Sequence, residues 1–400
     1  MTAPHNPRNA GDLDPDFGDA GLAPFPAGLQ DGHSRLLSDG RILSACTDSV
    51  SARITVLRHL QNGTLDPSFG EQGVTHIDMP DAQVAAYTRM LVLPDDSALV
   101  YGPVGSGGSH HSFVCRILPD GALDSAFGVA GFCILDFGHQ TDLVSEIVRL
   151  DDGKITALVS GPGADGLHDV YLARLVNGHL DPSFGENGEG YVRVSRLVTL
   201  HFALTASGGY VLTPWTDFST ATFRQYLADG SLDRAFGENG QVTVPLPSPT
   251  GNARFNQVTV QADGKILAVG RANVGFGPHT LTVRLNPDGS MDNTFNNGEA
   301  KIMVFQGYQT SNTDVATLPD GTMVAAGNIE ARPSDVTLMR LQPNGNLDMS
   351  FGSNGLVISD LGGDEKCNGM EVQRDGRILV SGTRTLEGAP HRMFLARYLG

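Results

Sequence analysis

One short string, Leu-Asp-x-x-Phe-Gly, returns seven times along the chain in intact or degraded form. The copies lie at residues 13–18, 65–70, 123–128, 180–185, 232–237, 291–296 and 347–352. Their mean spacing is about 56 residues, which is longer than the repeat of a helical solenoid. Self-similarity at such a period indicates one supersecondary unit per copy, so the chain is expected to be a repeat protein.

Two further signals recur between the strings and indicate β-strands. Asp-Gly turns precede β-rich runs, as at Asp152-Gly153 and Asp263-Gly264, and such turns favour tight hairpins. An arginine stands four to six residues before another Gly-containing turn, at Arg58, Arg116, Arg174, Arg224, Arg284, Arg340 and Arg397. In the fifth repeat we predict strands at 255–262, 265–271, 279–286 and 298–304. Four antiparallel strands per repeat make one propeller blade.

The two ends of the chain are complementary. The N-terminal end supplies one string and a short run at 21–25 with the pattern of a fourth strand. The C-terminal end supplies three strands, predicted at 367–374, 377–383 and 391–399. Joining them completes a seventh blade and leaves no open sheet edge. We therefore predict an all-β chain, a single seven-bladed β-propeller over residues 11–400 that follows a flexible tail at 1–10.

The string itself is predicted to serve folding in every blade. Its Asp is expected to cap a tight turn, and its Phe is the only large apolar residue present in all seven copies. We expect this Phe to fill the space between adjacent blades.

These motifs resemble the delta-60 repeat proteins, a bacterial family whose repeats carry an R-L-x-P-D-G turn and an L-D-x-S-F-G string. Residues 284–289 (RLNPDG) and 180–185 (LDPSFG) are close matches, and the resemblance spans about residues 12–400. It implies a β-propeller scaffold and no agreed activity, substrate or catalytic residues. Family members often look exported, whereas this chain starts without a cleavable leader, so a cytoplasmic location or leaderless export is expected.

Charge and cysteine content exclude several partners. Lys and Arg number 27 against 44 Asp and Glu, and the net charge of −17 repels phosphate backbones and anionic lipid. Nucleic acid is therefore not an expected partner, and no apolar run is long enough for membrane insertion. The four cysteines show no metal-binding or disulfide spacing, so free thiols and no cofactor are predicted.

Function is expected where the sevenfold symmetry breaks. If the first strand of each blade lines the central channel, the position six residues before the Asp-Gly turn or its equivalent is polar in six blades. These predicted ligand-binding residues are His33, Arg89, Glu146, His201, Gln257 and Asp314. Gly369 holds the seventh position, and the residue after each is predicted to be mostly core. No metal is predicted there, because facing blades seldom bring ligands within about 2–2.5 Å of one ion.

Three functional hypotheses remain open. No catalytic signature such as G-x-S-x-G, H-E-x-x-H or a P-loop occurs, which favours a non-catalytic binding propeller that recognises a protein, peptide or glycan. The first alternative is a hydrolase or lyase at the channel mouth with His33 or His201 as general base. The second is a structural surface or assembly module.

Overall fold

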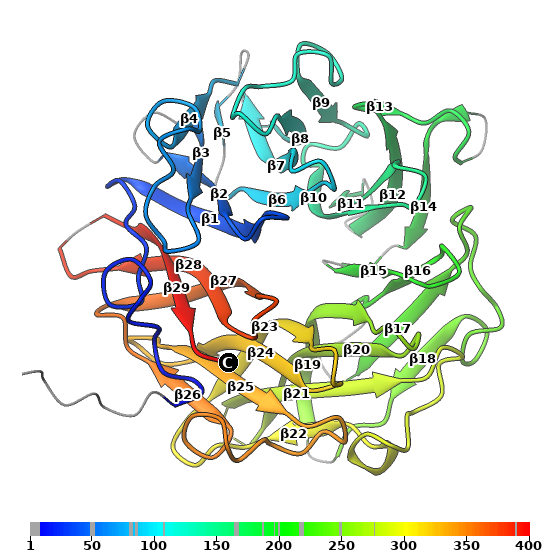
Figure 1. The fold of residues 1–400 in the computed structure, drawn as a ribbon. Coiled ribbons are helices and arrows are strands. Elements are labelled where there is room, and N and C mark those ends of the chain that lie inside the picture. Colours follow the sequence, from blue (N-terminus) through cyan, green and yellow to red (C-terminus); the bar gives the residue numbers. More distant parts are fainter. Residues whose placement is uncertain are drawn as a thin grey trace, which may run out of the picture.

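The computed structural model describes residues 9–48, 53–79, 83–84, 87–106, 109–163, 168–185, 188–195, 197–198, 201–215, 220–247, 250–275, 277–388 and 390–400. Regular structure in these residues is β-strand, apart from short 3-10 turns such as η2 (Asn296–Gly298). Seven antiparallel sheets follow one another around a ring (Figure 1). Within the described segments, no helix is long and apolar enough to cross a membrane.

Each sheet is one blade, and its strands follow chain order. Blade 1 contains β1 (Leu29–Leu36), β2 (Ile42–Asp48), β3 (Arg53–His59) and β4 (Val74–Ile77). Blade 2 contains β5 (Gln83–Val84), β6 (Arg89–Val92), β7 (Ala98–Ser106), β8 (Ser109–Ile117) and β9 (Phe132–Leu135). Blade 3 contains β10 (Leu143–Arg149), β11 (Ile155–Pro162), β12 (His168–Val176), β13 (His179–Leu180) and β14 (Tyr191–Ser195). Blade 4 contains β15 (Phe202–Leu204), β16 (Tyr210–Leu212), β17 (Ala221–Tyr226) and β18 (Gln241–Val244).

The remaining blades continue the same order. Blade 5 contains β19 (Thr250–Val260), β20 (Ile266–Val274), β21 (Gly277–Leu285) and β22 (Lys301–Met303). Blade 6 contains β23 (Thr310–Thr317), β24 (Met323–Ile329), β25 (Val336–Leu341) and β26 (Leu356–Ser359). Blade 7 contains β27 (Asp364–Val372), β28 (Ile378–Thr385) and β29 (Arg392–Tyr398). The predicted four strands of the fifth repeat are therefore confirmed, with hairpins that extend further than expected.

The N-terminal segment completes blade 7, as predicted. Leu13 and Leu22 form antiparallel bridges with Tyr398 and Ala396 of β29. The amide of Ala23 donates to the carbonyl of Leu395 at 2.9 Å, and the amide of Arg397 donates to the carbonyl of Gly21 at 2.9 Å. The ring is thus closed by hydrogen bonds between the two ends of the chain. The predicted tail lies mainly outside the described residues, although the Ala10 carbonyl accepts from the amide of Gly352 at 2.8 Å.

The core lies between adjacent blades. The first strands of the blades contact one another around the ring, so they are the innermost strands, as assumed from the sequence. The residue after each channel position is buried in every blade, as predicted, at Ser34, Met90, Ile147, Phe202, Val258, Val315 and Met370. The seven string phenylalanines are at most 3% exposed: Phe17, Phe69, Phe127, Phe184, Phe236, Phe295 and Phe351. All four cysteines are buried and free.

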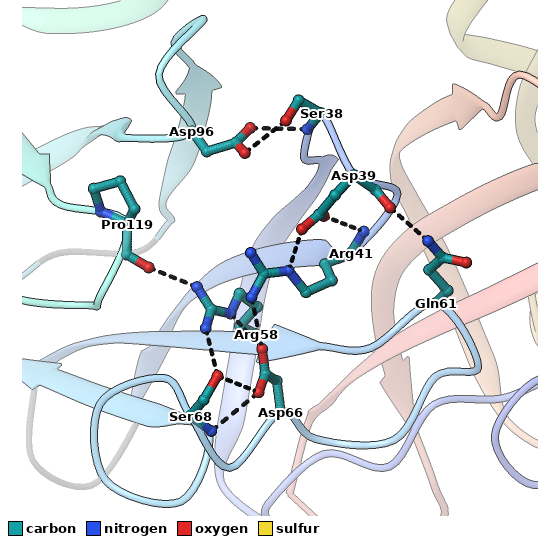
Figure 2. A network of polar contacts seen from close by, with 9 residues as sticks. All are labelled: Ser38, Asp39, Arg41, Arg58, Gln61, Asp66, Ser68, Asp96 and Pro119. Carbon is teal, nitrogen blue, oxygen red and sulfur yellow. Dashed lines mark hydrogen bonds and ion pairs between the residues drawn. The ribbon is translucent and has the colours of Figure 1, made fainter.

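The repeated polar residues form a latch between neighbouring blades, shown for blades 1 and 2 in Figure 2. Arg58 donates through Nε to Asp66 Oδ2 at 2.8 Å and through Nη1 to the carbonyl of Pro119, in blade 2, at 2.5 Å. The other carboxylate oxygen of Asp66 accepts from the Ser68 amide at 3.0 Å, which closes the expected capped turn. The Arg58 guanidinium lies 4.7 Å from the ring centroid of Phe69. Charge pairing, turn capping and aromatic packing therefore meet in one place.

Arg224, a member of the predicted series, does not belong to this latch. In blade 4 the amide of Asp233 donates to the carbonyl of Gln225, as the amide of Asp66 does to that of Arg58. Gln225 Nε2 donates to Asp233 Oδ2 at 2.9 Å, so it stands where Arg58 stands in blade 1. Arg224 is one residue away, and in a strand a shift of one position turns the side chain to the opposite face, where its Nε donates to Gln241 Oε1 at 3.0 Å.

Candidate functional site

The six predicted ligand-binding residues, called here the ring residues, lie on or beside the innermost strands of blades 1 to 6. Five innermost strands carry a register shift, or β-bulge, immediately before the channel position: between Gln30 and His33, Val144 and Glu146, Phe255 and Gln257, Asn312 and Asp314, and Cys367 and Gly369. A bulge bends its strand and redirects the next side chain. In these five strands the side chain at the channel position therefore does not follow the regular alternation of a β-ladder.

The carboxylates of the ring residues are used to join blades. Glu146 Oε2 accepts from the amide of Phe202, in blade 4, at 3.1 Å. Asp314 Oδ2 accepts from the amide of Met370, in blade 7, at 2.9 Å, and its Oδ1 accepts from the amide of Val315 at 2.8 Å. Burial raises the pKa of Asp314, the Arg35 charge opposes this rise, and the Glu146 charge adds to it. Charges from blades 1, 3 and 6 thus act on one another at the channel.

His33 reaches across the seam between blades 1 and 7. Its Nε2 lies 3.1 Å from the carbonyl oxygen of Asn368, which can only accept, so Nε2 carries the proton. A methyl group on Gly369 would lie 2.1 Å from that nitrogen, which explains why the seventh channel position has no side chain. Burial, together with the charges of Arg35 and Arg89, holds the pKa of His33 well below its usual value. His33 is therefore a neutral group near pH 7.

His201 and Glu146 form the one direct pair among the ring residues. His201 Nδ1 lies 3.4 Å from Glu146 Oε2, and the imidazole is 8% exposed. This is the geometry of a histidine held beside a carboxylate, although the distance is longer than a good hydrogen bond. Gln257 makes no such link, because its Oε1 accepts from the amide of Val258, the next residue, at 2.8 Å.

Two charged channel residues were missed from the sequence. Arg35 and Glu371 lie two residues after the channel positions of blades 1 and 7, and Arg35 Nε is 3.4 Å from Glu371 Oε1. Glu371 Oε2 also accepts from the amide of Leu36 at 2.6 Å. The sequence contains a signal for both residues, because they are charged at a position that is uncharged in the other blades. There the position holds Leu91, Val148, Ala203, Thr259 and Ala316.

Arg89 differs from the other charged channel residues. It begins β6 and pairs in register with Tyr101 of β7, and its side chain is half-buried. Among the described residues, no hydrogen bond or ion pair to its guanidinium is found. The ring carboxylates Glu146 and Asp314 each accept from a backbone amide of another blade. Its charge nevertheless lowers the pKa of His33. Arg89 is therefore a cation at the channel whose donors have no partner in the described part of the chain.

No ring residue belongs to either group of metal-capable side chains found in the described part of the chain. A separate hollow of about 530 Å³ lies on the outer edge between blades 4 and 5, lined by Glu238, Asn239, Gln241, Thr243 and neighbouring residues. Glu238 is its only titratable lining residue, and the hollow is remote in sequence from the innermost strands. The channel brings together more charged and titratable side chains than this outer hollow does.

Two stretches of the chain, 261–295 and 318–351, match a family model described as "Domain of unknown function (DUF5122) beta-propeller". Each stretch runs from the turn before a second strand to the string phenylalanine. The match supports the expectation of a β-propeller repeat family, and the delta-60 name stays a prediction. No curated protein sequence matches the chain.

Solved structures resemble the chain in fold. A protein of unknown function from Dyadobacter fermentans DSM 18053 is 13% identical over 98% of both chains, with a TM-score of 0.44. Puromycin hydrolase is 13% identical with a TM-score of 0.53, and the match covers 98% of this chain but 56% of the hydrolase. A polysaccharide lyase, the PL25 ulvan lyase, is 11% identical over 97% of this chain and 94% of its own, with a TM-score of 0.47. Identities this low concern the fold alone.

Proposed function

We propose that this chain is a non-catalytic binding propeller that recognises an acidic group of a protein, peptide or glycan at the channel mouth, with Arg89 as the principal anchor. The observation that carries the proposal is that the guanidinium of Arg89 has no hydrogen bond or ion pair among the described residues, while the carboxylates of Glu146 and Asp314 bind backbone amides. A planar guanidinium binds a carboxylate or sulfate through two parallel hydrogen bonds. Arg35 adds a second positive charge at the channel, although it also contacts Glu371, and this charge likewise favours an acidic ligand.

The state of the other ring residues supports binding rather than catalysis. A general base needs a pKa near the working pH and access to substrate, and the lowered pKa of the buried His33 fits neither requirement. Glu146 and Asp314 hold neighbouring blades together through Phe202 and Met370. The net charge of −17 disfavours nucleic acid and anionic membranes as partners, so the acidic group would be recognised locally at the channel.

A composite hydrolase or lyase site is the second candidate. It is favoured by His201 beside Glu146 and by the raised pKa of Asp314, which would keep that carboxyl available as an acid. In this alternative His201 acts as general base, Glu146 orients its imidazole, and Asp314 donates the proton. The likeness to puromycin hydrolase adds nothing to it beyond the fold.

The experiment is a binding screen of the purified chain against arrayed acidic and neutral glycans and peptides. Wild type is compared with Arg89→Gln and with Arg149→Gln, a matched control that removes an exposed arginine from β10. We expect acidic members to bind wild type and the control, and Arg89→Gln to bind them about tenfold or more weakly. Equal binding by both variants would refute Arg89 as anchor. Turnover of a bound member, lost in His201→Ala, would establish the catalytic alternative.

The structural-module hypothesis has its own signature. It predicts a stable symmetric self-association that buries at least about 1,000 Å² and no ligand in the screen. Sedimentation of the same sample would detect it.

A further inference from the structure

Two blade junctions carry groups of metal-capable side chains in equivalent places. The groups are His111, Asp136 and Asp142 between blades 2 and 3, and Asp335, Asp360 and Glu365 between blades 6 and 7. Within each group one ligand atom per residue lies within 4.8 Å of the others. In both, the first residue lies 13 positions before the string Asp, the second 12 after it, and the third four before the next channel position.

The junction between blades 2 and 3 is satisfied by the protein itself. Asp142 is fully buried, and its Oδ2 accepts from the amide of Phe137 at 2.8 Å. Its Oδ1 lies 2.7 Å from Nδ1 of His139, which sits in the loop before β10. The buried carboxylate of this junction therefore needs no further partner.

At the junction between blades 6 and 7, the buried carboxylate has no hydrogen-bond partner among the described residues. Glu365 is 1% exposed, and neither of its carboxylate oxygens has a hydrogen-bond partner among the described residues. Asp335 has no partner for its carboxylate in the same part of the chain, and Asp360 accepts only from the amide of Gly362, at 2.7 Å. Arg384, the cross-strand neighbour of Glu365, donates to the carbonyl of Leu361 instead.

Three carboxylates this close together repel one another, and a buried unpaired charge is strongly disfavoured. A cation bound among the three carboxylates would offset this repulsion.

We propose that Asp335, Asp360 and Glu365 bind a calcium ion that links blade 6 to blade 7. An all-carboxylate donor set suits a hard cation, and calcium accepts six to eight oxygen ligands in flexible geometry. Asp360 is exposed, so water can complete the coordination and the ion has a route of entry. Magnesium demands stricter octahedral geometry, which three protein carboxylates at one seam supply less readily.

The backbone around the trio is already held in place. The amide of Glu365 donates to the carbonyl of Ser334 at 2.8 Å, and Asn328 Nδ2 donates to the carbonyl of Glu365 at 2.9 Å. Asn328 Oδ1 accepts from the amide of Cys367 at 2.9 Å. These contacts join β24, the segment that leads into β25, and β27, so the backbone that carries the trio is held in place by the protein itself.

The test is calorimetric titration of EDTA-treated full-length chain with CaCl₂, and in parallel with MgCl₂. We expect one calcium per chain with a dissociation constant of about 10⁻⁵–10⁻³ M, and a higher melting temperature in calcium. Glu365→Gln should weaken calcium binding about tenfold or more, while the matched variant Asp136→Asn at the other junction should retain it.

Melting without calcium separates loss of the site from loss of folding. Because Glu365→Gln removes an unpaired buried carboxylate and keeps its shape, it should melt at or above the wild-type temperature in EDTA. No heat of binding with wild type, unchanged binding in Glu365→Gln, or loss in Asp136→Asn would each overturn the proposal. Tighter binding of magnesium than of calcium would overturn the choice of ion.

Discussion

Replacing Phe69, the string phenylalanine of blade 1, tests whether this residue stabilises the junction between adjacent blades. Phe69 is 1% exposed and packs against the turn of blade 2, where a methyl group on Gly121 would lie 3.1 Å from its ring. Truncation of a buried Phe to Ala costs about 3–5 kcal/mol in lost transfer energy and cavity formation. The guanidinium of Arg58 over the ring adds about 0.5–2 kcal/mol to the loss.

The loss converts into a measurable melting shift. An unfolding entropy of about 2.1 cal/mol/K per residue over 400 residues gives about 0.84 kcal/mol/K. A loss of 3–5 kcal/mol therefore lowers the melting temperature by about 4–6 °C if the ring unfolds as one unit. Differential scanning calorimetry and urea unfolding followed by circular dichroism measure the shift independently. Val129→Ala is the control, because Val129 follows the string of blade 2 and is 75% exposed.

Blade 4 provides a matched comparison for the cation-π contribution. Phe236 is also 1% exposed and also packs against a turn glycine, Gly289, but Gln225 stands where the other blades have the latch arginine. Phe236→Ala should therefore destabilise by less than Phe69→Ala, by about 0.5–2 kcal/mol. A loss under about 1 kcal/mol in Phe69→Ala would refute inter-blade burial as the role of this residue. Equal losses in the two variants would refute the guanidinium contribution.

Two further predictions concern the channel seam and acid stability. Gly369→Ala should lower the melting temperature because its methyl group would overlap the imidazole of His33. The double variant His33→Ala/Gly369→Ala removes that overlap and should recover most of the lost melting temperature. A double variant that melts as low as Gly369→Ala would contradict the steric explanation. Burial disfavours the charged forms of Asp181 and Asp292. Hydrogen bonds from Ser183 and the charge of Lys154 nevertheless lower the pKa of Asp181 to about 2. Hydrogen bonds from Thr294 and the charge of Arg284 lower the pKa of Asp292 to about 2 as well. Their stabilisation is complete above about pH 4, the usual Asp range, and is lost as pH falls through about 2, so Asp292→Asn should flatten the melting-temperature profile between these values.

Much of the fold was predictable because each repeat carries its own local signals. Asp-Gly turns and alternating apolar residues specify hairpins without reference to distant parts of the chain. The string phenylalanine marked the inter-blade core, and the complementary ends predicted the pairing of residues 21–25 with β29. Arg224 shows the limit of such counting. In a worn repeat the motif alone does not distinguish two neighbouring positions, and only the ladder places Gln225 in the latch.

The candidate site was only partly predictable for the same reason. The position of the ring residues followed from counting along each strand, but their partners did not. Nothing local to His33 indicates that its imidazole fills the space above Gly369, 336 residues away. Arg35 and Glu371 were visible as charges at a position that is uncharged in the other blades, yet their proximity depends on the closure of the ring.

The sequence by itself determined the number of blades, the order of strands within each blade and the residues that seal adjacent blades. These properties depend on interactions within one repeat or between successive repeats, which the period reproduces seven times. The tertiary structure alone decided which charges share the channel, which carboxylates are used by backbone amides, and that Arg89 and Glu365 lack partners among the described residues. Burial and long-range charge interactions depend on where all seven blades lie around the ring, and no single repeat contains that information.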